Sequence, residues 1–143
     1  MAVTISPYNH TDRRFRDGSN VAGDTYRLML CTAATFDATH TTLAAITKTE
    51  VANGNGYTTN GPALTGVTIN TANTNGSRFD ANDVVLSASG GSIAAEFGIL
   101  YNDTDSGDPP LFFIDFGEVK TAADGTDFLV VWAANGILDS QVA

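Results

Sequence analysis

Short segments in which apolar and polar residues alternate constrain the fold of this chain more than any other feature of its sequence. Four segments show the alternation clearly: residues 25–32, 93–101, 112–116 and 128–132. In the first, Tyr26, Leu28 and Leu30 fall on one face and the intervening residues on the other. A period of two residues is that of a β-strand, so the pattern predicts four strands. In the second segment it predicts one shared face for Ile93, Ala95, Phe97, Ile99 and Tyr101.

Clusters of Gly, Asn, Asp and Pro separate the alternating segments and predict turns. They occupy residues 53–56, 60–62, 73–76, 102–110 and 123–125. Two shorter strands are expected at residues 67–69 and 84–86, and short helical pieces at residues 11–16 and 42–48. Short strands at near-regular spacing predict an all-β fold, an antiparallel β-sandwich that is jelly-roll-like or related, with one or two helical turns.

The chain is expected to form one domain over residues 1–143, with residues 1–23 as a candidate N-terminal arm. A chain of this length can bury roughly two-thirds of the surface that its unfolded form exposes. No fixed-period repeat or linker divides the sequence, and no apolar run approaches the roughly 20 residues of a membrane helix. The first residues lack the basic start and apolar core of a secretory signal, so we expect synthesis and folding in a cytoplasm.

The charge balance disfavours two classes of partner. Sixteen acidic residues against seven Lys and Arg give a formal net charge of −9. Such a surface repels both nucleic-acid phosphates and anionic membranes. The single cysteine, Cys31, excludes an internal disulfide and a cysteine-based zinc site, and we interpret it as a small buried hydrophobe.

Residues 51–64 crowd glycine and asparagine around one tyrosine. Gly54, Gly56 and Gly61 can take positive φ angles without steric cost, and the neighbouring asparagines tolerate the same region. Tyr57 is expected to pin this loop to the edge of the core. The segment is therefore interpreted as a structural turn rather than a ligand-binding cradle.

A series of weak motifs runs through most of the chain in a fixed order. They are residues 24–32; V-x-x-G-x-G-Y-x-x-x-G-x-x-L over residues 51–64; F-D-A-x-D-V over residues 79–84; residues 95–103, which end in L-Y-N-D; I-D-F-G over residues 114–117; and W-x-x-x-G-I-L over residues 132–138. This order resembles a family of small virion structural proteins of tailed bacteriophages. The resemblance covers roughly residues 24–138, and residues 1–23 depart from the helix-rich opening of that family.

The resemblance implies a non-enzymatic particle component located in the virion and made in the bacterial host cytoplasm. The leading expectation is a capsid decoration or cement protein that bridges capsid subunits and stabilises the shell. Its partners would be the major capsid protein or other virion subunits, and a homo-oligomer, dimer or trimer, is expected. The alternatives are a neck or tail component, or a receptor- or glycan-binding module that uses the turn-rich rim with Tyr57 and Tyr101.

The sharpest metal candidate is the acidic loop at residues 102–108. Asp103, Asp105 and Asp108 could offer oxygen ligands to Ca²⁺, but Gly107 and Ile114 occupy positions where an EF-hand needs ligands. We favour a solvated hairpin loop, and no metal or other cofactor is expected.

No catalytic constellation emerges from the remaining polar residues. Glu96 and Asp115 are the acids within apolar strands, and alternation places both on solvent-facing positions. His10 and His40 lie in polar, turn-like surroundings, and no G-x-S-x-G, Walker A or dinucleotide motif is present. The sequence predicts a protein that is not an enzyme.

A basic cluster near the N-terminus is the candidate partner-binding site. Arg13, Arg14 and Arg16 hold three of the seven basic residues, with the aromatic residues Tyr8 and Phe15 beside them. Arginine forks pair well with carboxylates, and aromatic residues are enriched in binding hot spots. The cluster predicts an arm that docks on an acidic neighbouring subunit, against the simpler alternative of a solvated turn of helix.

Overall fold

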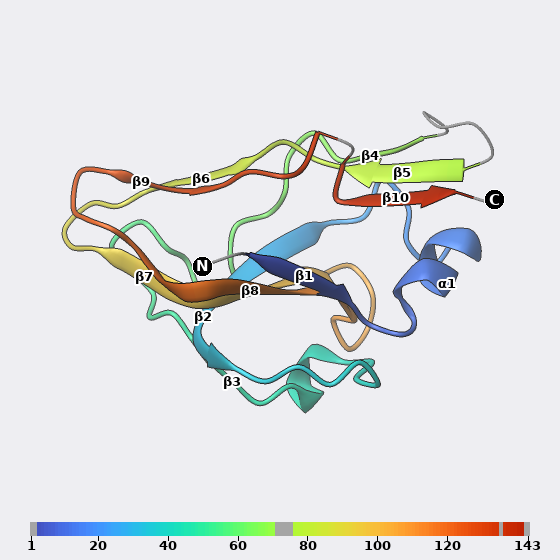
Figure 1. Ribbon diagram of the computed structural model, residues 1–143, viewed down its shortest axis with the longest axis horizontal. Helices are drawn as coiled ribbons and strands as arrows, with labels where there is room; N and C mark the ends of the chain where they lie inside the picture. Colours follow the sequence, from blue (N-terminus) through green and yellow to red (C-terminus); the bar gives the residue numbers. More distant parts are fainter. Residues whose placement is uncertain (1–2, 71–75, 135, 142–143) are drawn as a thin grey trace.

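The computed structural model describes residues 3–70, 76–134 and 136–141, and in this part of the chain every strand pairing is antiparallel (Figure 1). One layer is a five-stranded sheet. In spatial order its strands are β1 (Thr4–Pro7), β8 (Pro110–Ala122), β7 (Ile93–Asn102), β2 (Tyr26–Ala34) and β3 (Lys48–Glu50). The expected all-β, antiparallel, sandwich-like fold is confirmed.

The second layer consists of two smaller sheets. One is the pair β6 (Val84–Ser87) and β9 (Asp127–Val130), and the other joins β10 (Leu138–Gln141), β5 (Gly76–Asp80) and β4 (Thr68–Asn70). In Figure 1 the two sheets lie end to end above the five-stranded sheet, because the chain passes directly from β5 to β6 and from β9 to β10.

The main core lies between the layers, and alternation on β2 shows how it forms. Tyr26, Leu28 and Leu30 are fully buried and belong to this core, together with Ile114 and Phe116 of β8. The other face of the five-stranded sheet carries a second apolar cluster of eight buried residues: Tyr8, Met29, Cys31, Leu43, Ile46, Ile99, Tyr101 and Phe113. The five-stranded sheet is therefore apolar on both faces, unlike an antiparallel sheet that exposes one face to solvent.

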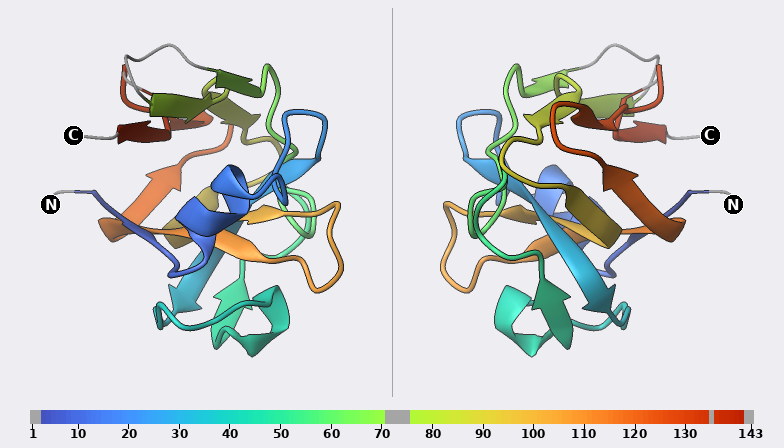
Figure 2. Two further views of the ribbon diagram at one scale, coloured as in Figure 1. Left: turned by 90° about the vertical axis from the view of Figure 1, so that its right-hand side faces the viewer. Right: turned by 90° about the vertical axis from the view of Figure 1, so that its left-hand side faces the viewer.

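Helix α1 (Thr11–Arg16) closes one end of the sandwich. It lies beside the gap between the layers at the right of Figure 1 and faces the viewer in the left panel of Figure 2. The ring of Phe15 packs 4.9 Å from that of Phe79 on β5, and the Thr11 hydroxyl donates to the Leu111 carbonyl at 2.6 Å. The helix thus contacts both layers, and its bounds match the expected helical piece.

Two sequence expectations differ from the structure. The helix expected at residues 42–48 is a single 3-10 turn, Leu43–Ala45, followed by β3. The single shared face expected along β7 is also wrong, because Ile93 and Ala95 face the main core whereas Phe97, Ile99 and Tyr101 face the second cluster. The register shifts between Ala95 and Phe97, where Glu96 alone lies opposite residues 116–119 of β8, and the two faces exchange at this irregularity.

Candidate interaction surface

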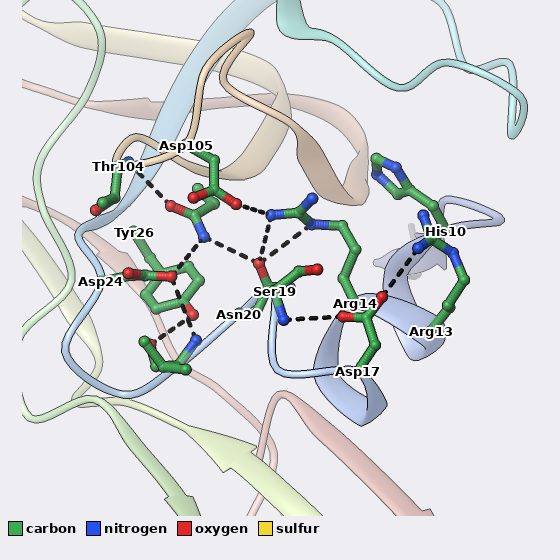
Figure 3. A network of polar contacts seen from close by, with 12 residues as sticks. His10, Arg13, Arg14, Asp17, Ser19, Asn20, Asp24, Tyr26, Thr104 and Asp105 are labelled. Atoms are coloured by element: carbon green, nitrogen blue, oxygen red, sulfur yellow. Dashed lines mark hydrogen bonds and ion pairs between the residues drawn. The ribbon is translucent and has the colours of Figure 1, made fainter.

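Arg14 belongs to a polar network that joins α1 to the 102–108 loop (Figure 3). Its guanidinium forms an ion pair with Asp105 and donates to the Asn20 side-chain oxygen at 3.1 and 3.2 Å. Its side chain is only 13% exposed. This arginine is therefore engaged within the chain rather than presented to a partner.

The network continues to the ends of β2 and β7. The Asn102 side-chain amide donates to Asn20 and to Asp24, each at 2.9 Å. Asn20 and Asn102 are both buried. The Tyr26 hydroxyl donates to the Val21 carbonyl at 2.8 Å, and burial raises the pKa of Tyr26. The network fixes residues 17–24 against the sheet.

The other residues of the candidate partner-binding site differ in how far their side chains are exposed. Arg13 and Arg16 have side chains 67% and 58% exposed and form ion pairs along the helix, with Asp17 and Asp12. Tyr8 is 1% exposed, in edge contact with the Phe36 ring, and burial raises the pKa of its phenol. Of the five residues expected at a partner site, only Arg13 and Arg16 have largely exposed side chains. Within the candidate arm, β1 pairs with β8, and His10 and Thr11 contact the carbonyls of Pro110 and Leu111.

The 51–64 turn covers the edge of β2. Leu28 N–H donates to the Pro62 carbonyl, Val51 N–H to the Leu30 carbonyl, and Leu64 N–H to the Tyr26 carbonyl, at 3.1, 2.9 and 2.8 Å. The loop thus supplies hydrogen bonds that a neighbouring strand would otherwise make. This is one of the ways in which native proteins protect a sheet edge.

The glycines of this turn hold conformations that other residues reach only with strain. Gly54, Gly56 and Gly61 have φ angles of 121°, 100° and 86°. A Cβ on Gly61 would lie 2.0 Å from the Leu28 carbonyl oxygen. The loop can approach β2 closely only because this position is glycine.

Tyr57 occupies the core and not the rim. It is 2% exposed, its hydroxyl donates to Glu50 at 2.7 Å, and burial raises its pKa. Tyr101 is 1% exposed and donates to the Asn60 carbonyl at 2.7 Å. The glycan-binding alternative placed both tyrosines on the turn-rich rim, whereas the structure buries them.

Two carboxylates of the acidic loop at residues 102–108 pair with arginine side chains. Arg27 donates to Asp103 at 2.8 Å, and this bond raises the arginine pKa, while Asp105 pairs with Arg14. Burial, followed by the charge of Asp103, raises the pKa of Asp108. Within residues 3–70, 76–134 and 136–141, no group of three His, Cys, Asp or Glu side chains is placed to hold a metal ion.

Two of the other candidate chemical groups, Cys31 of β2 and Asp115 of β8, lie opposite Phe97 on the strands that flank β7, beside Glu96. Asp115 accepts the Gly117 N–H at 2.8 Å, in the irregular part of β8 that lies opposite the half-buried Glu96. The Nε2–H of His10 donates to the Pro110 carbonyl at 2.7 Å. Cys31 is fully buried, and burial together with the charge of Glu50 raises its pKa to about 12.

A feature that the sequence interpretation missed is an open apolar groove of about 300 Å³ between the two layers, beside β1 and β9. Ile114, Phe116, Phe128, Val130 and Trp132 line its inner part, and all of them are buried. Val3, Ile5, Leu129 and Val131 line its rim and are 54%, 43%, 56% and 63% exposed. Exposed apolar groups gathered around one groove are a mark of an interaction site.

Two strand edges flank the groove. β1 is an edge strand of its sheet, and in the described part of the chain β9 pairs with β6 alone. The sequence carried a signal for this surface, since residues 128–132 are apolar on both strand faces although only one face was assigned to the core. Val3 and Ile5, which stand isolated near the N-terminus, gave no comparable signal.

No protein-family model, curated protein or solved structure matches this chain in the three comparisons made. None of the helices in residues 3–70, 76–134 and 136–141 has the length and apolar character of a transmembrane span.

Proposed function

We propose that this chain is a non-enzymatic structural protein of a tailed-bacteriophage particle, where it decorates and cements the capsid. Two independent features support the proposal: the ordered series of motifs that resembles phage virion proteins, and the apolar groove. The groove carries most of the weight, because its exposed apolar rim and the flanking edge strands β1 and β9 suit contact with another protein.

Cementing follows from burial of apolar surface between neighbours. A chain that seats an apolar rim on two adjoining capsid subunits makes their separation expose additional apolar area, at about 25 cal/mol per Å² before the costs of association. The energy per contact is modest, but a shell repeats the contact many times. The major capsid protein is the proposed partner, and self-association as a dimer or trimer is compatible with the same role.

A neck or tail component is the second candidate, because it would use the same surface in far fewer copies. The glycan-binding alternative loses its proposed aromatic contacts, since Tyr57 and Tyr101 are buried. Nothing else in the described residues favours it.

Copy number tests the proposal directly. The chain is quantified by mass spectrometry in purified particles, relative to the major capsid protein. A ratio near one, or a simple fraction of one, supports a cement protein. A handful of copies moves the chain to the neck or tail, and its absence from particles overturns the virion assignment.

A further inference from the structure

The chain protects its strand edges unequally. The edge of β2 is covered by residues 51–64, and the edge of β1 carries Pro7 beside the polar Thr4 and Ser6, which discourage addition of another strand. Within residues 3–70, 76–134 and 136–141, the free edge of β9 lacks such protection. Residues 128–132 read Phe-Leu-Val-Val-Trp, with no proline, glycine or charge.

The groove runs along this unprotected edge. Six consecutive residues, 127–132 of β9 and the two positions after it, line it, whereas the N-terminal segment contributes only Ile5 of β1 and Val3 just before it. Successive residues of a strand point to opposite faces, so a groove lined by all of them faces the backbone edge. Main-chain N–H and C=O groups of β9 therefore border an apolar hollow.

Charge distinguishes between the possible occupants. The charged residues that line the groove are Lys120 and Asp127, and Lys120 is already paired with Glu118 at 2.8 Å. The two lining charges cancel, and counting Glu118, which lies outside the lining, brings the local sum to −1, on a chain with a formal net charge of −9. A second copy of the chain would bring like charge, whereas a basic segment would be attracted.

We propose that the groove is a docking site for an extended segment of a partner protein, which adds as a strand to the free edge of β9. The segment carries apolar side chains at alternate positions and Lys or Arg between them. Its apolar side chains enter the groove beside Ile5 and Phe116, and its basic side chains lie near Asp127. Main-chain hydrogen bonds supply affinity and the groove selects the side chains, as in other cases of strand addition.

The inference rests on the proposed function only for the identity of the partner, which on a particle would be a neighbouring subunit. The binding itself is testable without particles. The probe is a blocked seven-residue peptide that alternates valine with lysine and threonine, titrated into the full chain and followed by backbone amide chemical shifts. Two control peptides carry proline at the central valine, or glutamate in place of each lysine.

Paired substitutions locate the site. Val131→Lys places a positive charge on the groove rim, and Val85→Lys places the same charge at a similarly exposed position on β6 that does not line the groove. We expect Val131→Lys to weaken peptide binding at least tenfold and Val85→Lys to change it less than twofold. In the unsubstituted chain, the peptide should slow hydrogen exchange of the amides at residues 127–132, a readout that does not depend on how the variants fold.

Several results would overturn the inference. They are no binding of the lysine peptide at millimolar concentration, equal binding of the glutamate or proline peptide, or exchange protection elsewhere in the chain. A dimer seen by sedimentation and abolished by Val131→Lys, without peptide binding, would assign the groove to a second copy instead. High copy number on particles with no peptide binding would leave the proposed function standing and reject the strand-addition site. Peptide binding by a chain that is absent from particles would reject the proposed function and leave the strand-addition site standing.

Discussion

The phenol oxygen of Tyr57 accepts a hydrogen bond from the backbone N–H of Leu30 at 3.1 Å, and so takes the place of a strand partner. β3 pairs with β2 only from Cys31 onward, so in the described part of the chain this stretch of β2 has a neighbouring strand on its β7 side alone. The same hydroxyl donates to Glu50, whose carboxylate also accepts the Asn60 N–H at 2.6 Å. One side chain therefore joins a strand edge, a carboxylate and a turn.

Replacing Tyr57 by phenylalanine should destabilise the fold by about 1–3 kcal/mol, because the buried Leu30 N–H loses its acceptor. Urea unfolding followed by circular dichroism measures the change. Glu50→Gln is the matched control, since it keeps an acceptor for the hydroxyl and should cost less. An unchanged midpoint for Tyr57→Phe would contradict the role of the hydroxyl.

Gly61→Ala and Gly125→Ala separate backbone strain from close contact. The two φ angles are nearly equal, 86° and 84°, but a Cβ meets nothing within 4 Å at Gly125 and lies 2.0 Å from the Leu28 carbonyl oxygen at Gly61. We expect about 1 kcal/mol of destabilisation at Gly125, from the positive φ alone. At Gly61 we expect about 3 kcal/mol or more, because backbone must move. Equal losses would show that the 51–64 turn shifts freely.

Arg14→Ala should destabilise the chain by about 2 kcal/mol, because it removes the partner of Asp105 and two hydrogen bonds to buried Asn20. Arg13→Ala should leave the unfolding midpoint nearly unchanged, since its ion pair with Asp17 is exposed. Comparable losses for the two variants would show that the inward and outward arginines are not distinct.

Asp108 should make stability depend on pH in an unusual direction. Its folded-state pKa is raised above the ordinary 3.8, so the folded state binds more protons between the two pKa values and stability falls as pH rises through them. Asp108→Asn should therefore raise the unfolding midpoint at pH 7, and this gain should vanish below about pH 3.8. Asparagine suits the local φ of 48°.

Asp37→Asn provides the opposite case. Hydrogen bonds from Thr39 hold the Asp37 pKa below its ordinary value, so this carboxylate stabilises the fold at neutral pH and the contribution is lost as pH falls through its folded-state pKa. The variant should lose stability at pH 7 and little in acid. Parallel pH profiles for the Asp108 and Asp37 variants would refute both assignments.

Cys31 should react with thiol reagents only when the chain unfolds. A shift of its pKa from 9.0 to about 12 lowers the thiolate fraction at pH 8 about a thousandfold, and full burial blocks access as well. Labelling with a disulfide reagent at pH 8, with and without denaturing urea, measures the difference. Rapid stoichiometric labelling of the native chain would contradict the buried position.

The sequence predicted the parts of the fold whose pattern is local. Alternation located β2, β7, β8 and β9, because each carries a full apolar face. It missed β1, β3, β5 and β10, which have three to five residues each and little apolar character, so that pairing with distant strands determines them.

The face exchange along β7 was equally hidden. It coincides with the irregular part of β8 opposite Glu96, where Gly117 has a φ of 83°, and alternation along β7 does not reveal it. The prediction that the basic cluster acts as one site overlooked the geometry of the helix. Arg13 and Arg14 are adjacent in sequence but lie on different sides of α1, and only the latter meets the acidic loop.

The pairing of β1 with β8 has a consequence for biosynthesis. Thr4 lies opposite Asp115, and the contacts of His10 and Thr11 with the same strand span 100 positions. The first strand and the helix leave the ribosome long before the strand that anchors them exists. Both segments therefore remain without their strand partner while most of the chain is translated. The chain between β1 and β8, which their pairing closes into a loop, is nearly as long as the domain. Such non-local closure is slow, on the order of milliseconds to seconds for β-rich domains, so the last event in folding should be the docking of the segment made first.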